Sequence, residues 1–172
     1  MSQIYQREMY AIAVPQIHAD ILAKFGRDMN QQDGLWAITL HQPWAYAFTS
    51  LGKDIENRTW RCRFKPGTWV AIHAGKRFDQ AAADWIKRVI GKLVGSDGAE
   101  RQAGIVAIAR FKGNVTNSES GWFVGPVGWQ FDRVVPVERI DIKGRQGWWR
   151  VPDDVAQKLI AIAAQAEADS NG

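Results

Sequence analysis

The sequence has 172 residues, of which 46% are hydrophobic and 11% aromatic, and it carries a formal net charge of +4. This length predicts one main domain with its own hydrophobic core, and the single Cys62 excludes an internal disulfide framework. The three histidines are scattered, which argues against a zinc site, and the mild basic charge is compatible with nucleic acid without requiring it.

Nothing in the sequence predicts a membrane protein. No apolar run approaches the roughly 18 residues that a membrane-spanning helix needs. The N-terminal residues lack the basic start and apolar core of a signal peptide. We therefore expect a cytoplasmic protein without a membrane partner. No residue pattern predicts a cofactor or a metal, and the oligomeric state is left open.

Residues 1–34 predict an N-terminal helical extension and a linker. Ile17, Ile21 and Phe25 recur at helical spacing after Pro15, a residue that suits the first turn of a helix. An apolar stripe of this kind is expected to pack on the main domain or on a partner.

The main domain is expected over residues 35–152, followed by a C-terminal helix and tail over residues 153–172. Strands are predicted over residues 35–40, 54–60, 69–74, 104–111 and 134–142, and helices over 43–51 and 78–93. Pro136 argues for an edge position of the last strand, because proline lacks an N–H for a second neighbour. The glycine-rich residues 120–130 predict a loop. Several strands with few helices between them predict an α+β fold, with a small barrel and flanking helices.

The densest group of basic and aromatic side chains lies within residues 40–76. Glu56 and Arg58 are two positions apart on a predicted strand, so they emerge from one face about 6–7 Å apart. Lys53 comes just before this row. A lysine beside a carboxylate can act as a general base or hold a phosphate. The plainer interpretation is a solvated ion-pair network, worth about 0.2–1 kcal/mol per pair.

The tryptophans of this region have two interpretations. Trp44, Trp60 and Trp69 are each more typical of a core, because aromatic side chains dominate protein interiors. Trp122 and Trp129 occur in the predicted glycine- and proline-containing loop, where binding residues concentrate. For Trp122, stacking on a base and burial are equally favoured.

Two further side chains carry potential chemistry. His73 ends a predicted strand, and a lone histidine is more often a hydrogen-bonded structural residue than a catalyst. Cys62 lies between Arg61 and Arg63, which would lower its pKa, but nothing around it supplies a catalytic triad. We therefore expect Cys62 to be incidental.

At these residues the sequence resembles the activating signal cointegrator homology (ASCH) domain. The resemblance is carried, in order, by LHQPWA from Leu40, GKDIENRTW from Gly52, IHAGK from Ile72, and then GWFVGPVGWQF with IKGRQGWWRVP. It covers about residues 35–152. ASCH domains belong to the PUA-like superfamily, whose members fold as small β-barrels with flanking helices. Many PUA-like domains bind RNA, modified bases or DNA in a cleft beside the barrel.

The resemblance implies a ligand cleft that recognises a nucleobase or modified nucleoside of RNA or another single-stranded nucleic acid. The expected ligand-binding residues are Gln42, Pro43, Trp44, Lys53, Glu56, Asn57, Arg58 and Trp60, with His73 and Lys76 near the rim and Trp122 and Lys143 completing the walls. Lys53, Arg58 and a basic patch of Arg61, Arg63 and Lys65 are expected to contact phosphates. Glu56 or Gln42 would hydrogen-bond a base edge.

Two alternatives stay open. Some bacterial relatives are amidohydrolases that deacetylate N4-acetylcytidine with a lysine and a threonine three positions later; here Glu56 stands at the threonine position. A carboxylate is a poor substitute for a hydroxyl that must form and release an ester. A hydrolase, amidohydrolase-like or ribonuclease-like, would use Lys53 as base and Glu56 to orient it or to activate water. The third interpretation is a protein-interaction module in a transcription-related or phage-related complex.

Overall fold

The computed structural model describes residues 34–95, 98 and 101–169. The helix predicted around residues 17–25 lies outside these residues. Leu35–Val151 form one compact unit, and helix α4 (Asp153–Ala168) belongs to a second unit. Both clefts described below are built from the first unit.

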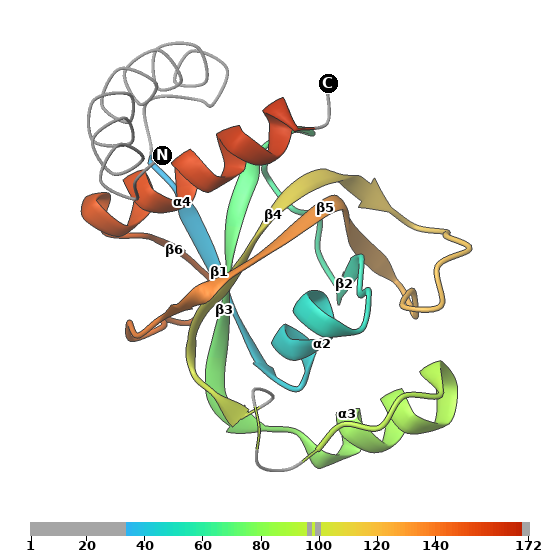
Figure 1. Cartoon of the computed structure of the whole chain (residues 1–172). Helices are drawn as coiled ribbons and strands as arrows, with labels where there is room; N and C mark the ends of the chain where they lie inside the picture. Colours follow the sequence, from blue (N-terminus) through green and yellow to red (C-terminus); the bar gives the residue numbers. More distant parts are fainter. Residues whose placement is uncertain (1–33, 96–97, 99–100, 170–172) are drawn as a thin grey trace, which may run out of the picture. The chain divides into compact units, whose positions relative to one another are not determined.

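The first unit is a six-stranded mixed sheet with short helices, so the α+β class is confirmed (Figure 1). Its elements are β1 (Trp36–Gln42), α2 (Trp44–Ser50), β2 (Ile55–Arg58), β3 (Trp69–Phe78), α3 (Gln80–Trp85), the π-helical turn η1 (Ile86–Ile90), β4 (Gly104–Val115), β5 (Val127–Ile140) and β6 (Trp148–Arg150). The strand order is β2-β5-β4-β3-β1-β6. The β1–β3 pair is parallel, and the other pairs are antiparallel.

The sheet curls until side chains near its two ends meet. Trp129 on β5 stacks on Trp148 of β6, with ring centroids 5.2 Å apart, although these strands stand far apart in the strand order. Among the described strands no hydrogen-bonded ladder joins β2 to β6, so the sheet is not closed into a barrel. Helix α2 lies within the curve (Figure 1), where Phe48 packs edge-on against Phe131 at 5.5 Å.

The core of the unit follows from the period-two pattern of its strands. Val70 and Ile72, which share a face of β3 as the alternation predicts, are fully buried in one apolar cluster with Phe111 and Trp129. Burying each large aliphatic or aromatic side chain contributes roughly 1.5–3 kcal/mol. This cluster therefore holds the curled strands and α2 together.

The C-terminal half of the sheet differs from the sequence prediction. Strand β5 begins at Val127, so Trp129 lies in a strand and is fully buried instead of standing in a loop. The order places β5 between β2 and β4, not at an edge. Pro136 is nevertheless tolerated, because the pairing with β2 ends at Gln130 and Pro136 faces only Ala107 of β4 in the observed register.

The helix predicted over residues 78–93 is shorter than expected. Phe78 belongs to β3, where it pairs with Gln42 of β1. Helix α3 begins after Asp79, whose side-chain carboxylate accepts a hydrogen bond from the Ala82 N–H, as a helix N-cap does. Gly91 has φ of 73°, a left-handed conformation that ends the helical segment.

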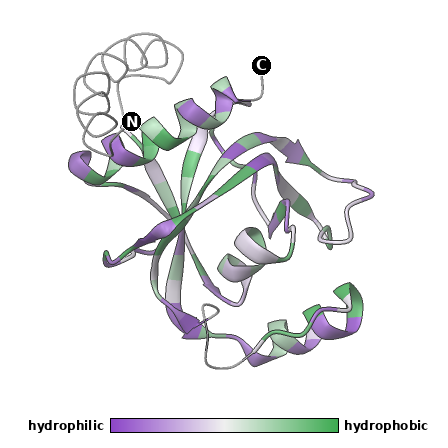
Figure 2. Ribbon diagram, in the orientation of Figure 1, coloured by the Kyte–Doolittle hydropathy of each residue, from purple (hydrophilic) through white to green (hydrophobic). Residues whose placement is uncertain are grey.

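Helix α4 confirms the predicted C-terminal helix. Pro152 precedes it, and Asp153 and Asp154 lie in its first turn, where negative charge is favourable. Figure 2 shows hydrophilic and hydrophobic residues alternating along this helix. Within the described ranges, no helix combines the length and the apolar character that crossing a membrane requires.

Candidate functional site

Two clefts of the first unit contain most of the predicted site residues. The narrow cleft, of about 400 Å³, has Lys53, Glu56, Asn57 and Asp79 as its polar lining, and Trp44, Trp85 and Val124 among its apolar lining. The wide cleft, of about 860 Å³, includes Arg58, Trp60, His73, Lys76 and Lys143. The single cleft predicted from the sequence is therefore divided in two.

Lys53 is the buried cation of the narrow cleft. It lies in the short segment between α2 and β2, and its side chain is only 2% exposed. Its ammonium nitrogen Nζ donates to the carbonyl of Ile55 and lies 3.2 Å from Glu56 Oε2. It also faces the rings of Phe48 and Trp44, at 4.8 and 5.6 Å. Burial lowers the pKa of Lys53, and the neighbouring Glu56 carboxylate opposes that shift.

Glu56 connects the two clefts. One carboxylate oxygen pairs with Lys53, and the other lies 3.1 Å from Nη2 of Arg58. Glu56 lines the narrow cleft, whereas Arg58 lines the wide one. The side chain of Glu56 is 12% exposed, so one largely buried carboxylate serves two cations. The strand alternation that places Glu56 and Arg58 on one face is confirmed by this contact.

Asn57 holds the loop that borders the narrow cleft. Its amide nitrogen donates to the Trp122 carbonyl at 2.8 Å, and its amide oxygen accepts from the Val124 N–H at 2.9 Å. These bonds place the exposed side chain of Val124 at the cleft. Trp122 itself is 7% exposed and packs against Trp85, so it supports the cleft from within rather than offering the surface stacking platform that was considered for it.

Trp60 is the exposed aromatic side chain of the wide cleft. It is 45% exposed, and its ring packs edge-on against Trp129 at 4.5 Å. The Arg58 guanidinium lies over Trp129 at 5.3 Å, and Arg58 Nε is buried without a hydrogen-bond partner in the described structure. Of the tryptophans considered for stacking, Trp60 is therefore the exposed one, whereas Trp44 is half-buried and lines the narrow cleft.

His73 fixes one wall of the wide cleft. It is 3% exposed, and its Nε2 lies 2.9 Å from the carbonyl of Ile142. A carbonyl can only accept, so Nε2 carries the proton. Burial lowers the pKa of His73, and the hydrogen bond to the Ile142 carbonyl opposes that shift. His73 thus acts as the structural residue expected from the sequence, and it ties the β5–β6 loop to β3.

We expect the buried His73 to make the fold less stable in acid. The folded state favours the neutral ring, whereas the unfolded chain takes up a proton near the ordinary pKa of 6.5, so stability falls as the pH drops below that value. As the pH falls from 8 to 5, the free energy of unfolding measured with urea should decrease more for the wild type than for His73→Gln. Equal pH dependence in the two proteins would contradict this expectation.

Gln42 and Pro43 lie beneath the site rather than in it. Gln42 is 1% exposed; its amide donates to the Gln102 carbonyl and accepts from the Tyr46 N–H, both at 3.0 Å. Pro43 is buried and precedes α2. Neither lines the two clefts. The base-edge contact expected of Gln42 does not fit this position, because its side chain holds the start of α2 in place.

The basic patch expected to contact phosphates also lies elsewhere. Arg61, Arg63 and Lys65 line neither cleft. Arg63 packs over the rings of Trp36 and Phe64, at 4.5 and 5.3 Å. Strand β2 ends at Arg58, so the strand alternation that aligns Glu56 with Arg58 does not extend to these three residues. Lys53 is likewise too deeply buried for the phosphate role expected of it.

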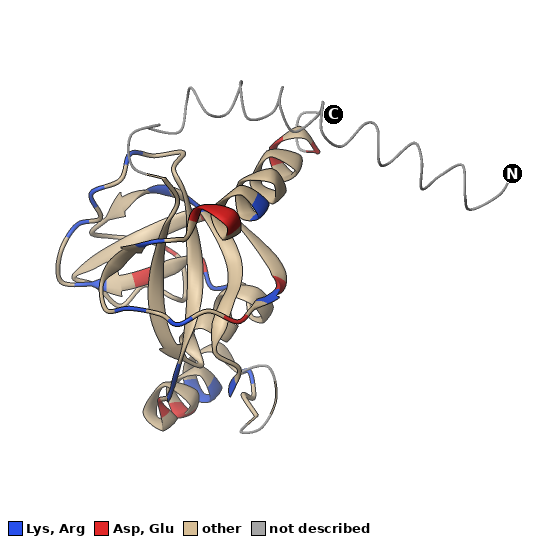
Figure 3. Ribbon diagram, turned by 90° about the vertical axis from the view of Figure 1, so that its left-hand side faces the viewer, with Lys and Arg blue, Asp and Glu red and all other residues tan. Residues whose placement is uncertain are grey.

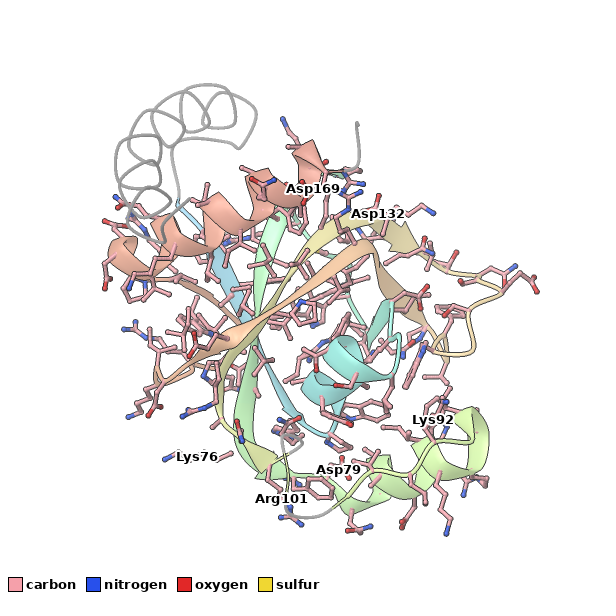
Figure 4. All side chains as sticks on the ribbon, in the orientation of Figure 1. Lys76, Asp79, Lys92, Arg101, Asp132 and Asp169 are labelled. Carbon is pink, nitrogen blue, oxygen red and sulfur yellow. The ribbon has the colours of Figure 1, made fainter. Side chains whose placement is uncertain are left out.

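Several cleft residues were not singled out from the sequence. Asp79 and Trp85 line the narrow cleft, and Arg77 and Arg145 line the wide one. Trp85 lies in the helix predicted over residues 78–93, where an aromatic side chain is more typical of core packing. Arg77 directly follows Lys76, and Arg145 lies two positions after Lys143. A second basic residue beside each predicted one is therefore the sequence signal that could have identified these two arginines. Figure 4 shows Lys76 directed away from the ribbon and Asp79 at the start of α3.

Within the part of the chain that the structure describes, no three His, Cys, Asp or Glu side chains gather as metal ligands would. Cys62 is buried, and burial raises the pKa of its thiol despite the nearby Arg63.

No family model matches this sequence, and no curated protein matches it either.

Proposed function

We propose that this protein is an ASCH-type member of the PUA-like superfamily that binds RNA or another single-stranded nucleic acid through one nucleobase or modified nucleoside. The ordered motifs from Leu40 to Pro152 support the family assignment. The curled sheet with α2 inside it is compatible with a partly open barrel, since the Trp129–Trp148 stack brings its end regions together.

The observation that carries the proposal is the lining of the narrow cleft. Trp44 and Trp85 supply aromatic surface, with ring centroids 5.7 Å apart, and the Lys53–Glu56 pair lies beside them. A cleft of about 400 Å³ falls in the usual range for small organic ligands, about 300–1,000 Å³. A planar base would gain about 1–3 kcal/mol by stacking on an aromatic side chain. Glu56 accepts a hydrogen bond from the base edge in this arrangement.

Titration of fluorescein-labelled single-stranded RNA and DNA 12-mers at 50 and 200 mM salt tests this function. We expect binding that weakens with salt, because phosphate contacts release counterions. Trp85→Ala is expected to weaken binding about tenfold, the lower part of the stacking range. Leu93→Ala, an exposed apolar residue outside both clefts, is the matched control. Absent binding, or binding indifferent to salt, would refute the proposal.

A hydrolase is the second candidate, and the buried Lys53–Glu56 pair favours it. The lowered pKa of Lys53 suits a general base, and Glu56 lies close enough to orient it. Incubation with N4-acetylcytidine and with RNA, for the wild type and Lys53→Ala, separates this function from binding. Turnover that disappears in Lys53→Ala would establish an enzyme; no turnover in either protein would exclude it for these substrates.

The interaction-module alternative depends on the terminal segments. Deletion of residues 1–34 would abolish complex formation with a protein partner if this alternative holds. Oligonucleotide binding by residues 35–152 would not change, since both clefts belong to Leu35–Val151.

A further inference from the structure

The wide cleft concentrates positive charge. Its lining includes five cationic side chains, Arg58, Lys76, Arg77, Lys143 and Arg145, against the single acid Asp141. The formal charge of these lining side chains is therefore +4, the same as the net charge of the whole chain. In Figure 3, Lys and Arg positions outnumber Asp and Glu positions along the loops of the face toward the viewer. A cleft with this charge attracts a polyanion.

The loop of residues 141–147 is packed tightly enough to hold two of these cations in place. It carries Lys143 and Arg145, and the His73–Ile142 hydrogen bond ties it to β3. A Cβ atom on Gly144 would lie 2.4 Å from His73 Cε1 and 2.7 Å from Thr39 Oγ1. The backbone of this loop therefore approaches β1 and β3 as closely as only glycine permits.

The two clefts meet at the Glu56–Arg58 pair. Glu56 belongs to the narrow cleft and Arg58 to the wide one, and the 3.1 Å contact joins them. Arg58 Nε is a buried donor with no partner in the described structure, which an anionic oxygen would satisfy. Trp60, whose ring is nearly half exposed, lies on the same side of this junction as Arg58.

We propose that the wide cleft binds the phosphodiester adjoining the base held in the narrow cleft, so that the ligand is a strand of at least two nucleotides rather than a free nucleoside. This inference rests on the proposed function. Arginine and lysine side chains bind the phosphate oxygens. Trp60 stacks on the neighbouring base, as aromatic side chains do in proteins that bind single strands.

Competition against a labelled RNA 12-mer tests this inference with three unlabelled probes: a mixture of the four nucleosides, mixed-sequence dinucleoside monophosphates, and the unlabelled 12-mer. The dinucleotides are expected to compete at least tenfold better than the nucleosides. Lys76→Gln combined with Lys143→Gln should weaken 12-mer binding about tenfold and reduce the salt slope by about 1.4, the value for two phosphate contacts to a single strand. The same double variant should leave nucleoside competition unchanged.

The controls separate loss of charge from loss of folding. Lys76→Arg with Lys143→Arg keeps the charges and is expected to retain binding. Lys92→Gln removes an exposed cation outside both clefts and should have little effect. Equal competition by nucleosides and dinucleotides, with an unaffected Gln double variant, would overturn the strand inference and leave the proposed function standing. Failure of every probe to bind the wild type would overturn both.

Discussion

Replacing Glu56 by glutamine is expected to destabilise the fold by about 3 kcal/mol or more, because it leaves a buried charge without its partner. Lys53 is 2% exposed, and Glu56 supplies its counter-charge at 3.2 Å. Lys53→Met should cost less, since Glu56 would keep Arg58, whose side chain is 30% exposed. Urea unfolding of both single variants measures this asymmetry. Equal losses of unfolding free energy in the two variants would contradict the expectation that Lys53 needs Glu56 more than Glu56 needs Lys53.

The double variant Lys53→Met, Glu56→Gln isolates the pair. It is expected to be more stable than Glu56→Gln alone, with a coupling of about 1–3 kcal/mol, because no buried cation remains. The loss of unfolding free energy in Glu56→Gln should also shrink as the pH rises toward 10.5, the ordinary pKa of lysine. The reason is that burial lowers the pKa of Lys53 in the folded state, whereas the unfolded chain still binds the proton. Additive losses that do not change with pH would rule out the proposed coupling.

Gly144→Ala is expected to displace the loop that carries Lys143 and Arg145. The added methyl group would overlap the His73 ring, with the Cβ atom 2.5 Å from Nδ1, and overpacking of this kind costs about 1–3 kcal/mol. Under the strand inference, the variant should also bind the RNA 12-mer about tenfold more weakly. Thermal unfolding and the competition assay measure the two effects.

Gly121→Ala is the matched control for that substitution. A Cβ atom at Gly121 would meet its nearest neighbour, Ile90 Cδ1, at 3.8 Å, an ordinary contact distance. Neither Gly121 nor Gly144 has a positive φ, so the comparison isolates the steric effect from backbone conformation. If both variants were as stable as the wild type, the close packing of Gly144 on His73 would be refuted.

Much of the local structure could be predicted from the sequence because it depends on neighbouring residues. The apolar run before Pro43 and the helical spacing after it predict β1 and α2, and both are present. The alternation along residues 54–60 correctly predicts that Glu56 and Arg58 share a face. Trp129 was misassigned because the glycine and proline residues just before it predict a loop, whereas pairing with β2 and β4 makes this segment a strand.

By itself, the sequence determined the α+β class and the grouping of Lys53, Glu56 and Arg58, because helical and strand periodicity act within a few residues. The tertiary structure alone decided that these residues divide between two clefts and that Arg61 and Arg63 belong to neither. The reason is distance along the chain. Lys143 and Arg145 reach the wide cleft through a contact between His73 and Ile142, 69 positions apart, and no local pattern encodes such a contact.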